Sequence, residues 1–186
     1  MTGPLKVNDR RQVVGIYVDA DGGLHGFRWD HGEFTTIDVP GATATFVAGI
    51  DNRGRIVGAY MNADGTVHGF LRDRRGAITT LDAPFGDAGT TAGSINERGQ
   101  VVGLVANSAG GSRGFQWERG VFTPIDGTPD ATYTRALDIN NRGQIVGDYG
   151  TRPTAGTNSS LSRTAERLAG SELIDRLGLN LRGALT

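Results

Sequence analysis

One nine-residue phrase occurs four times in this chain at a nearly constant interval, and it limits the possible folds more than any other feature. The phrase pairs an apolar start with a polar, turn-forming middle, and it closes on glycine. The closing glycines, Gly15, Gly58, Gly103 and Gly147, are 43, 45 and 44 residues apart. Such self-similarity at a fixed period marks a chain built from copies of one structural unit. The copies span residues 7–15, 50–58, 95–103 and 139–147.

Two further phrases keep the same phase. The first ends at Phe27, Phe70 and Phe115, and reads His-Gly-Phe in two copies and Arg-Gly-Phe in the third. The second ends at an aspartate and contains Thr-Thr or Thr-Pro before an apolar residue. Because a phenylalanine recurs at one strand position, we expect these rings to lie in the core. The three aspartates are Asp38, Asp82 and Asp126.

Each unit contains four short runs rich in β-branched and aromatic residues, separated by glycine or asparagine turns, which is typical of strands and hairpins. In the second unit the predicted strands cover residues 45–50, 55–60, 67–72 and 77–81. The first turn ends at Gly54, where glycine accepts a positive φ without steric cost. The first unit has Arg11 at that position. Its turn is therefore predicted to be strained, rebuilt or frayed.

These features predict an all-β fold of tandem four-stranded antiparallel repeats. A lone meander of this size exposes one apolar face, so neighbouring units must stack to bury it. A period in the low to mid forties with four strands favours β-propeller blades over leucine-rich or helical repeats, and an open stack of meanders is the alternative. The repeat domain is expected over residues 1–150, as three full units and half of a fourth.

The repeat pattern stops after Gly150. Residues 151–160 read as a polar linker and residues 161–186 as a helical tail, with a helix expected over 159–178. Closed propellers usually have about 4 to 8 blades, so this chain is predicted to form an incomplete array. Three outcomes are open: self-association completes the ring, the tail caps one end, or the chain is a fragment of a longer repeat protein without independent function.

The phrases resemble the HAF repeat family of bacterial extracellular repeat proteins. The unit of that family reads roughly Gly-Ile-Asn-Asn-x-Gly-x-Val-Val-Gly, then His-Ala-Phe-Leu-Trp, then Thr-Asp-Leu-Gly. The match covers residues 5 to about 149 and is nearly verbatim at 139–147. Glycine replaces the family's alanine after His25 and His68, and Arg113 replaces the histidine. The resemblance implies an extracellular or cell-surface location, and it supplies no catalytic residues.

The histidines and the acidic turns are the candidate metal ligands. His25 and His68 occupy one repeat position and could in principle hold a metal, but Arg113 at the third copy cannot ligate a cation, and His31 has no counterpart. The turns beginning at Asp19 and Asn62 resemble the first half of a calcium loop. Position twelve is then Asp30 or Asp73, outside any helix-flanked loop, so hairpin turns are favoured.

The recurring aspartates and tryptophans admit a ligand-binding interpretation as well as a structural one. Asp38, Asp82 and Asp126 could converge as a carboxylate ring near a propeller axis, but capping of a turn through backbone N–H groups is favoured. Trp29 and Trp117, like the three phenylalanines, could stack on sugars, but their repetition favours the core. No catalytic residue, cofactor site or metal site is therefore predicted.

Composition excludes several functional classes. The net charge is −1, from 19 basic and 20 acidic residues, which gives no electrostatic reason to bind nucleic acid. The chain has no cysteine, which excludes thiolate catalysis and Cys-ligated zinc. Neither a signal peptide nor a membrane-spanning segment is visible in the sequence, so we expect a soluble chain without export by that route.

The resulting hypothesis is a non-enzymatic repeat module that binds or scaffolds a glycan or a protein at the cell surface. The alternative is a propeller-type hydrolase or lyase that uses axial carboxylates. A catalytic residue usually interrupts a repeat pattern, and the interruptions in this chain are undistinguished.

Overall fold

The computed structural model describes residues 2–151, and these residues form an all-β structure of 14 strands. No helix long and apolar enough to span a membrane occurs in this part of the chain. The predicted linker beyond Thr151 and the predicted tail helix lie outside the described residues. The strands are β1 (Thr2–Val7), β2 (Val13–Val18), β3 (Leu24–Asp30), β4 (Glu33–Ile37), β5 (Ala44–Ile50), β6 (Ile56–Met61), β7 (Val67–Arg72), β8 (Ile78–Leu81), β9 (Thr90–Ile95), β10 (Val101–Ala106), β11 (Ser112–Glu118), β12 (Val121–Ile125), β13 (Tyr133–Ile139) and β14 (Ile145–Gly150).

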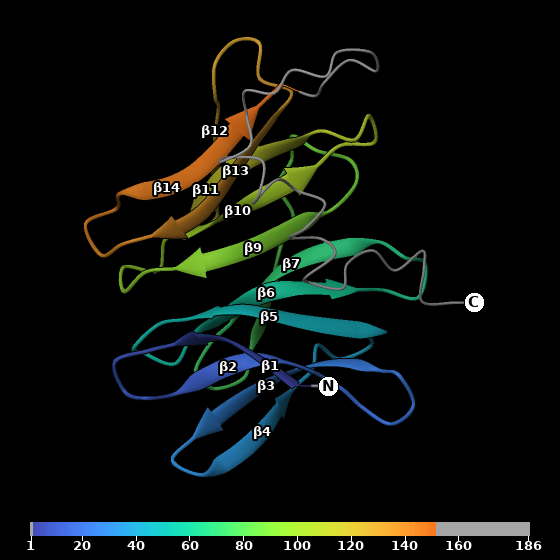
Figure 1. Ribbon diagram of the computed structural model, residues 1–186, viewed down its shortest axis with the longest axis vertical. Helices are drawn as coiled ribbons and strands as arrows, with labels where there is room; N and C mark the ends of the chain where they lie inside the picture. The colour runs from blue at the N-terminus through green and yellow to red at the C-terminus, as the bar shows by residue number, and fades with distance from the viewer. Residues whose placement is uncertain (1, 152–186) are drawn as a thin grey trace, which may run out of the picture. The chain divides into compact units, whose positions relative to one another are not determined.

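The predicted repeat units are confirmed as four-stranded antiparallel sheets, here called blades. Blade 1 has the strand order β1-β2-β3-β4, blade 2 has β5-β6-β7-β8, and blade 3 has β9-β10-β11-β12. The hairpin β13–β14 begins a fourth blade and joins β11 through one parallel pairing, Ser112 with Tyr133. Figure 1 shows the blades stacked in chain order. The fold is thus an incomplete β-propeller-like array, as the period predicts.

The first strands of successive blades lie side by side along the inner edge of the stack, in the order β1, β5, β9 and β13. The fourth strands, β4, β8 and β12, form the outer edges. At the inner edge, Lys6 of β1 makes an ion pair of 3.2 Å with Asp138 of β13, and the Ser94 hydroxyl of β9 donates to the same carboxylate at 2.5 Å. Equivalent positions of three first strands therefore converge on the axis.

Close strand contact explains the closing glycine of the repeated phrase. A Cβ on Gly58 would lie 1.9 Å from the carbonyl oxygen of Phe46 and 2.8 Å from the Phe70 ring. Gly15, Gly103 and Gly147 have equivalent contacts of 2.0 to 2.2 Å with the facing strand. Any larger residue would force the first two strands of a blade apart, so the glycine keeps the blade closed.

The apolar core lies between the blades. Each blade has a forward face toward the next blade and a backward face toward the preceding one. Phe70, on the backward face of blade 2, packs with Val14 and Ile37 on the forward face of blade 1. Phe115 packs likewise against Val57 of blade 2. The exposed fractions of Phe27, Phe70 and Phe115 are 3%, 0% and 0%, which confirms the predicted core rings.

Hydrogen bonds between the first turns of successive blades account for the polar middle of the phrase. Asn8 Nδ2 donates to the Asp51 carbonyl at 2.9 Å, and Asn96 Nδ2 donates to the Asn140 carbonyl at 3.0 Å. Asn52 N–H donates to Glu97 Oε1 at 2.7 Å. The partners are separated by 43, 44 and 45 residues, which is the repeat period itself. The phrase therefore encodes contacts between blades as well as a turn.

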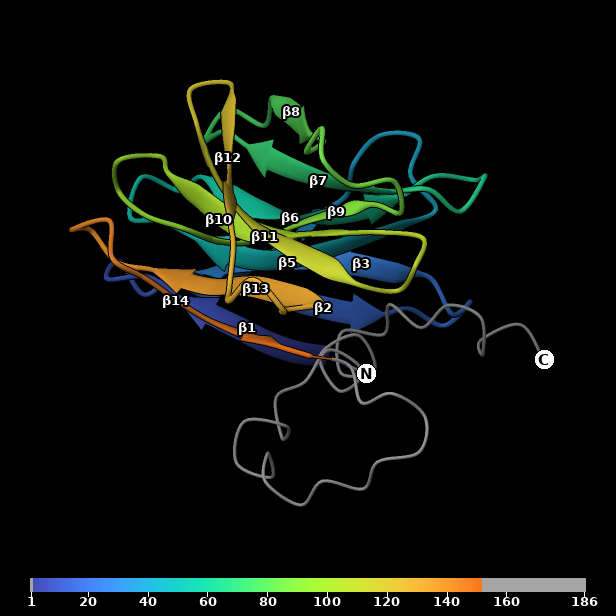
Figure 2. The same ribbon diagram turned by 90° about the horizontal axis from the view of Figure 1, so that it is seen from above.

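Both ends of the stack expose apolar side chains, because no blade within the described residues 2–151 covers them. Trp29 and Phe34 lie on the backward face of blade 1, and Phe34 is 53% exposed. Val7, on β1, is 61% exposed. At the other end, Val146 of β14 is 64% exposed. Figure 2 shows β1, β3 and β14 from above.

Candidate functional site

A polar and aromatic cluster lies on blade 1 beside the β2–β3 hairpin. The rings of Tyr17 and His25 stack with centroids 5.1 Å apart. His25 Nδ1 lies 3.0 Å from both carboxylate oxygens of Asp38, and His25 Nε2 lies 3.0 Å from Asp19 Oδ2. The Tyr17 hydroxyl bonds Thr36 at 2.9 Å. The antiparallel pairing of Tyr17 with His25 brings the two rings together.

Blade 2 carries the same cluster at the same place. Tyr60 stacks on His68 with ring centroids 5.2 Å apart, and His68 Nδ1 lies 2.9 and 3.0 Å from the Asp82 oxygens. Thr80 takes the place of Thr36 and bonds the Tyr60 hydroxyl at 3.1 Å. We call these two groups the Tyr–His–Asp clusters: Tyr17, His25 and Asp38 on blade 1, and Tyr60, His68 and Asp82 on blade 2.

Blade 3 has the equivalent carboxylate, but a different side chain pairs with it. Arg113 replaces the histidine and binds Asp126 with two nitrogens, Nε at 2.6 Å and Nη2 at 2.8 Å. The guanidinium also lies over the Phe85 ring, 5.4 Å from its centroid. Val105 stands where the other blades have tyrosine, so the third blade has an ion pair in place of the stacked rings.

Hydrogen bonds within these clusters favour the charged forms of several side chains. Burial lowers the pKa of His25, but hydrogen bonds to Asp19 and Asp38 more than offset this effect, and the pKa is raised overall. A backbone hydrogen bond from Gly23, together with His25, lowers the pKa of Asp19. The hydrogen bond from Arg113 lowers the pKa of Asp126. The side chains of Asp38 and Asp82 remain 46% and 55% exposed, so carboxylate oxygens face solvent in both clusters.

The sequence interpretations of Asp38, Asp82 and Asp126 both need correction. These residues follow the outer strands β4, β8 and β12, whereas the axis lies along the first strands, so they do not form an axial carboxylate ring. They bind side chains of the third strand in their own blade instead of the turn backbone that was favoured. Each carboxylate thereby fastens the end of the fourth strand to the third strand.

The predicted hairpin turns at Asp19 and Asn62 are confirmed. Asp19 N–H donates to the Gly23 carbonyl at 3.0 Å, and Asn62 N–H donates to the Thr66 carbonyl at 3.0 Å. The Asp19 carboxylate accepts backbone N–H groups of its own turn. Among the residues that the structure describes, no group of three or more His, Asp and Glu side chains is arranged to hold a metal ion. His25 and His68 are each engaged in their own cluster, and His31 contacts Asp30 at 2.6 Å.

The blade 2 cluster contains a hydroxyl, an imidazole and a carboxylate in a row, which is the arrangement of a catalytic triad. Thr66 Oγ1 lies 3.0 Å from His68 Nε2, and Asp82 binds the opposite ring nitrogen. However, Thr66 Oγ1 also donates its only proton to Asp64 at 2.6 Å. That carboxylate would repel the oxyanion that forms in acyl transfer. On blade 1, Gly23 stands at the threonine position and no hydroxyl is present.

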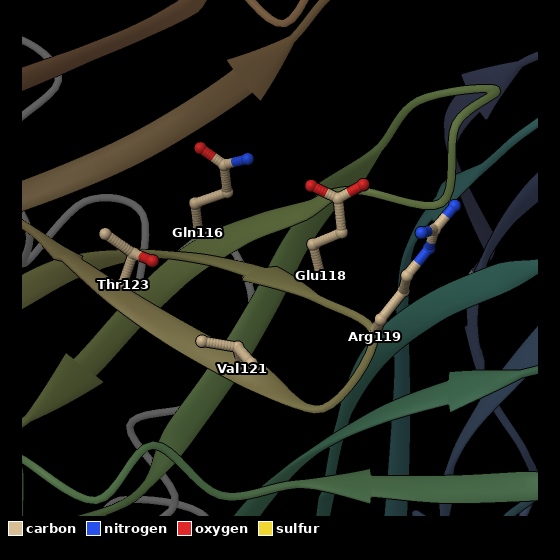
Figure 3. A pocket seen from close by; sticks show the side chains of 5 residues that line it. All are labelled: Gln116, Glu118, Arg119, Val121 and Thr123. Atoms are coloured by element: carbon tan, nitrogen blue, oxygen red, sulfur yellow. The ribbon is translucent and has the colours of Figure 1, made fainter.

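The tryptophans divide between surface and core. Trp117 packs against the core between blades 2 and 3, as predicted, whereas Trp29 is 38% exposed at the open end of the stack. A shallow hollow lies on the forward face of blade 3, where the third and fourth strands of a complete fourth blade would pack (Figure 3). Its lining residues are Gln116, Glu118, Arg119, Val121 and Thr123.

The sequence contained a signal for the clusters that reading one phrase at a time missed. The residue before Gly-Phe is basic in every complete unit, and the terminal residue is an aspartate in every complete unit, so the two positions are complementary in charge. His25 and His68 accompany aspartates in two units, and Arg113 accompanies an aspartate in the third. In each unit the two residues belong to the ends of adjacent antiparallel strands, so cross-strand pairing could have been inferred.

Fold and clusters together define a propeller-like repeat protein with one polar cluster on each complete blade. Two solved structures are similar to it. A fucose lectin from Kordia zhangzhouensis in complex with methyl-fucoside is 14% identical, with a TM-score of 0.45, and the match covers 68% of this chain and 99% of the lectin chain. A streptogramin B lyase is 15% identical, with a TM-score of 0.42, and the match covers 83% of this chain and 59% of the lyase chain. Neither a protein-family model nor a curated protein sequence matches the chain.

Proposed function

We propose that this protein is a non-enzymatic binding module that recognises hydroxyl-rich ligands, glycans in the first place, through its Tyr–His–Asp clusters at a cell surface. The main support for this proposal is that blades 1 and 2 present the same stacked rings and the same half-exposed carboxylate at equivalent places. Two equivalent sites on one array favour multivalent binding, which raises avidity without new contacts.

The chemistry of the clusters supports a polar neutral ligand. Each imidazole has a carboxylate on its Nδ1 side, Asp38 or Asp82, and a second carboxylate lies near its other nitrogen, Asp19 directly or Asp64 through Thr66. Carboxylate oxygens accept hydrogen bonds from vicinal hydroxyl groups, and charge-assisted bonds of this kind are the stronger ones. The neighbouring aromatic rings offer apolar surface of the kind that pairs with such polar groups in ligand sites.

Two observations favour binding over catalysis. The Thr66 hydroxyl donates its hydrogen bond to Asp64 and not to His68 Nε2, so the imidazole does not accept its proton as the base of a triad does. The cluster on blade 1, which is otherwise equivalent, has glycine in place of that threonine. The rings and the carboxylates are the groups that both blades share. A ligand that binds both clusters in the same way therefore contacts these groups and not the hydroxyl.

We also propose that the chain is a member of the HAF repeat family. The support is that every part of its first phrase has a structural task here: the asparagines link blades, the turn glycine adopts a positive φ, and the closing glycine admits close strand contact. The extracellular location follows from that membership and is proposed with it.

The test is a glycan-array screen of the whole chain, followed by titration calorimetry with the strongest glycan. We expect two sites per chain, and we expect the double variant Asp38→Asn/Asp82→Asn to bind at least about ten-fold more weakly, the cost of one charged hydrogen bond at each site. Asp126→Asn is the matched control, because its carboxylate pairs with arginine on blade 3, and it should bind as the wild type does. Absence of any glycan ligand on the array would contradict the proposal.

The hydrolase or lyase alternative is tested on the same variants. Turnover of a glycoside panel that Asp82→Asn abolishes, with an unchanged unfolding transition, would establish the enzyme and overturn the non-enzymatic proposal. Binding without turnover, lost in the double variant, supports the module.

A further inference from the structure

The interface between blades 1 and 2 contains two arginines that face each other. Arg28 pairs across the sheet with Val14, which belongs to the core between these blades, so Arg28 lies on the forward face of blade 1. Arg72 pairs with Ile56, which belongs to the same core, so Arg72 lies on the backward face of blade 2. The two arginines therefore lie on facing sides of one interface, and desolvation, followed by the charge of Arg28, lowers the pKa of Arg72.

The repeat provides an internal comparison for this pair. At the next interface, Leu71 occupies the position of Arg28 and Trp117 the position of Arg72, and both pack against the apolar core. Two like charges thus stand where the equivalent interface has two apolar side chains. Repulsion between the guanidiniums and their partial desolvation both oppose folding, so the pair has a cost that the next interface avoids.

Within residues 2–151, neither guanidinium has a hydrogen bond or an ion pair, and the Nε atom of Arg28 is buried without a partner. The nearest carboxylates in the sequence, Asp30 and Asp73, interact with Arg28 and Arg72 through charge, but their hydrogen bonds are made to other groups. Asp30 accepts from Gln12 at 2.7 Å and pairs with His31, and Asp73 accepts the backbone N–H groups of Arg75 and Ala77 at 2.8 Å. Buried donors in native proteins normally have partners, so this interface has an unused buried donor beside two like charges.

We propose that Arg28 and Arg72 form a binding site for a tetrahedral oxyanion, a sulfate or phosphate group, between blades 1 and 2. Each guanidinium presents planar, forked donors that match such a group bidentately. An anion between them would satisfy the buried donor and cancel the repulsion. Thr35, paired with Arg28 on the forward face of blade 1, adds a hydroxyl donor beside the site. The site is separate from the Tyr–His–Asp clusters and independent of their function.

The test compares thermal unfolding and titration calorimetry of the whole chain in sodium sulfate, sodium phosphate and sodium chloride at matched ionic strength. Sulfate or phosphate should raise the unfolding midpoint above that in chloride, since a ligand that binds only the folded state stabilises it. Arg28→Gln and Arg72→Gln should each weaken oxyanion binding at least about ten-fold. Arg142→Gln, on an exposed turn of the fourth unit, is the control and should respond as the wild type does.

A second variant separates ligand binding from a purely structural role. Arg28→Leu/Arg72→Trp installs the pair found at the next interface, and it should unfold at a higher temperature in chloride and show only the general stabilisation by sulfate, smaller than the response of the wild type. Equal midpoints in sulfate and chloride for the wild type, or an unchanged response in both glutamine variants, would overturn the proposal.

The same assay distinguishes a free ion from an esterified group. An O-sulfated disaccharide that acts at a concentration about ten-fold below that of inorganic sulfate would assign the site to a sulfated ligand, because additional contacts must then contribute. Equal or weaker action of the disaccharide would assign it to the free oxyanion.

Discussion

Asp51 stands where the other three units have asparagine, and the surrounding contacts show how the chain accommodates that change. In the other units the asparagine amide donates to a glutamine four residues later, as Asn96 does to Gln100 at 2.7 Å. Asp51 has no amide to donate, and Arg55 replaces the glutamine: its Nε binds the Asp51 carboxylate at 2.6 Å. Arg55 Nη2 then reaches the Asn96 and Glu97 carbonyls, 3.2 and 3.1 Å away, which restores the link to the next blade.

A double-mutant cycle tests this exchange. Arg55→Gln alone leaves a buried carboxylate without its cation and should lower the free energy of unfolding by about 3 kcal/mol, the lower end for a buried pair because Arg55 is partly exposed. Asp51→Asn/Arg55→Gln recreates the pair of the other units and should recover most of that loss. Urea denaturation measures both. Equal destabilisation in the single and double variants would show that the two positions are not coupled.

The first hairpin of each unit shows most directly how the identity of one residue affects backbone geometry. The first turns of units 2, 3 and 4 end at Gly54, Gly99 and Gly143, with φ values of 78°, 85° and 84°. Arg11 adopts φ of 64° at the equivalent position of unit 1. Of the three outcomes expected from the sequence, strain is therefore the one that occurs: the neighbouring blades impose the same turn on an unfavourable residue.

Exchanging these residues measures the strain. Arg11→Gly should raise the free energy of unfolding by about 1 kcal/mol, because the left-handed region costs an L-residue about 1–2 kcal/mol and glycine loses part of that gain through its unfolded-state entropy. Gly54→Arg should lower it by a similar amount, since a Cβ there meets open space and the backbone alone resists. Urea titrations of both variants check this. A stabilised Gly54→Arg would show that φ does not limit the turn.

The array formed by residues 2–151 is a stack of equivalent interfaces, and no further blade in this range covers either end. The backward faces of blades 2 and 3 are covered by the preceding blade, whereas no blade within residues 2–151 covers the backward face of blade 1, where Trp29 and Phe34 are exposed. The matching forward face at the far end carries Val146. By continuity with the interfaces inside the chain, the far end of one copy is the surface that fits blade 1 of another copy, a head-to-tail contact.

We therefore expect concentration-dependent self-association, measured by size-exclusion chromatography with light scattering. Trp29→Arg places on blade 1 the residue that blade 2 has at this position and should weaken association, because a charge then enters an apolar contact. Arg75→Ala, on an exposed turn of blade 2, should leave association unchanged. A monomer at every concentration would contradict the incomplete-ring interpretation.

The sequence by itself determined the period, the four strands of each unit and the core phenylalanines, because strand alternation and turn chemistry are local and repeat with the chain. Predicted strand bounds in the second unit agree with the observed ones to within one residue. Only the tertiary structure decided what the polar positions do. Asp38 and Asp82 meet histidines, the asparagines of one turn reach the next blade, and Arg28 meets Arg72, because each contact joins strands or blades whose spacing depends on stacking.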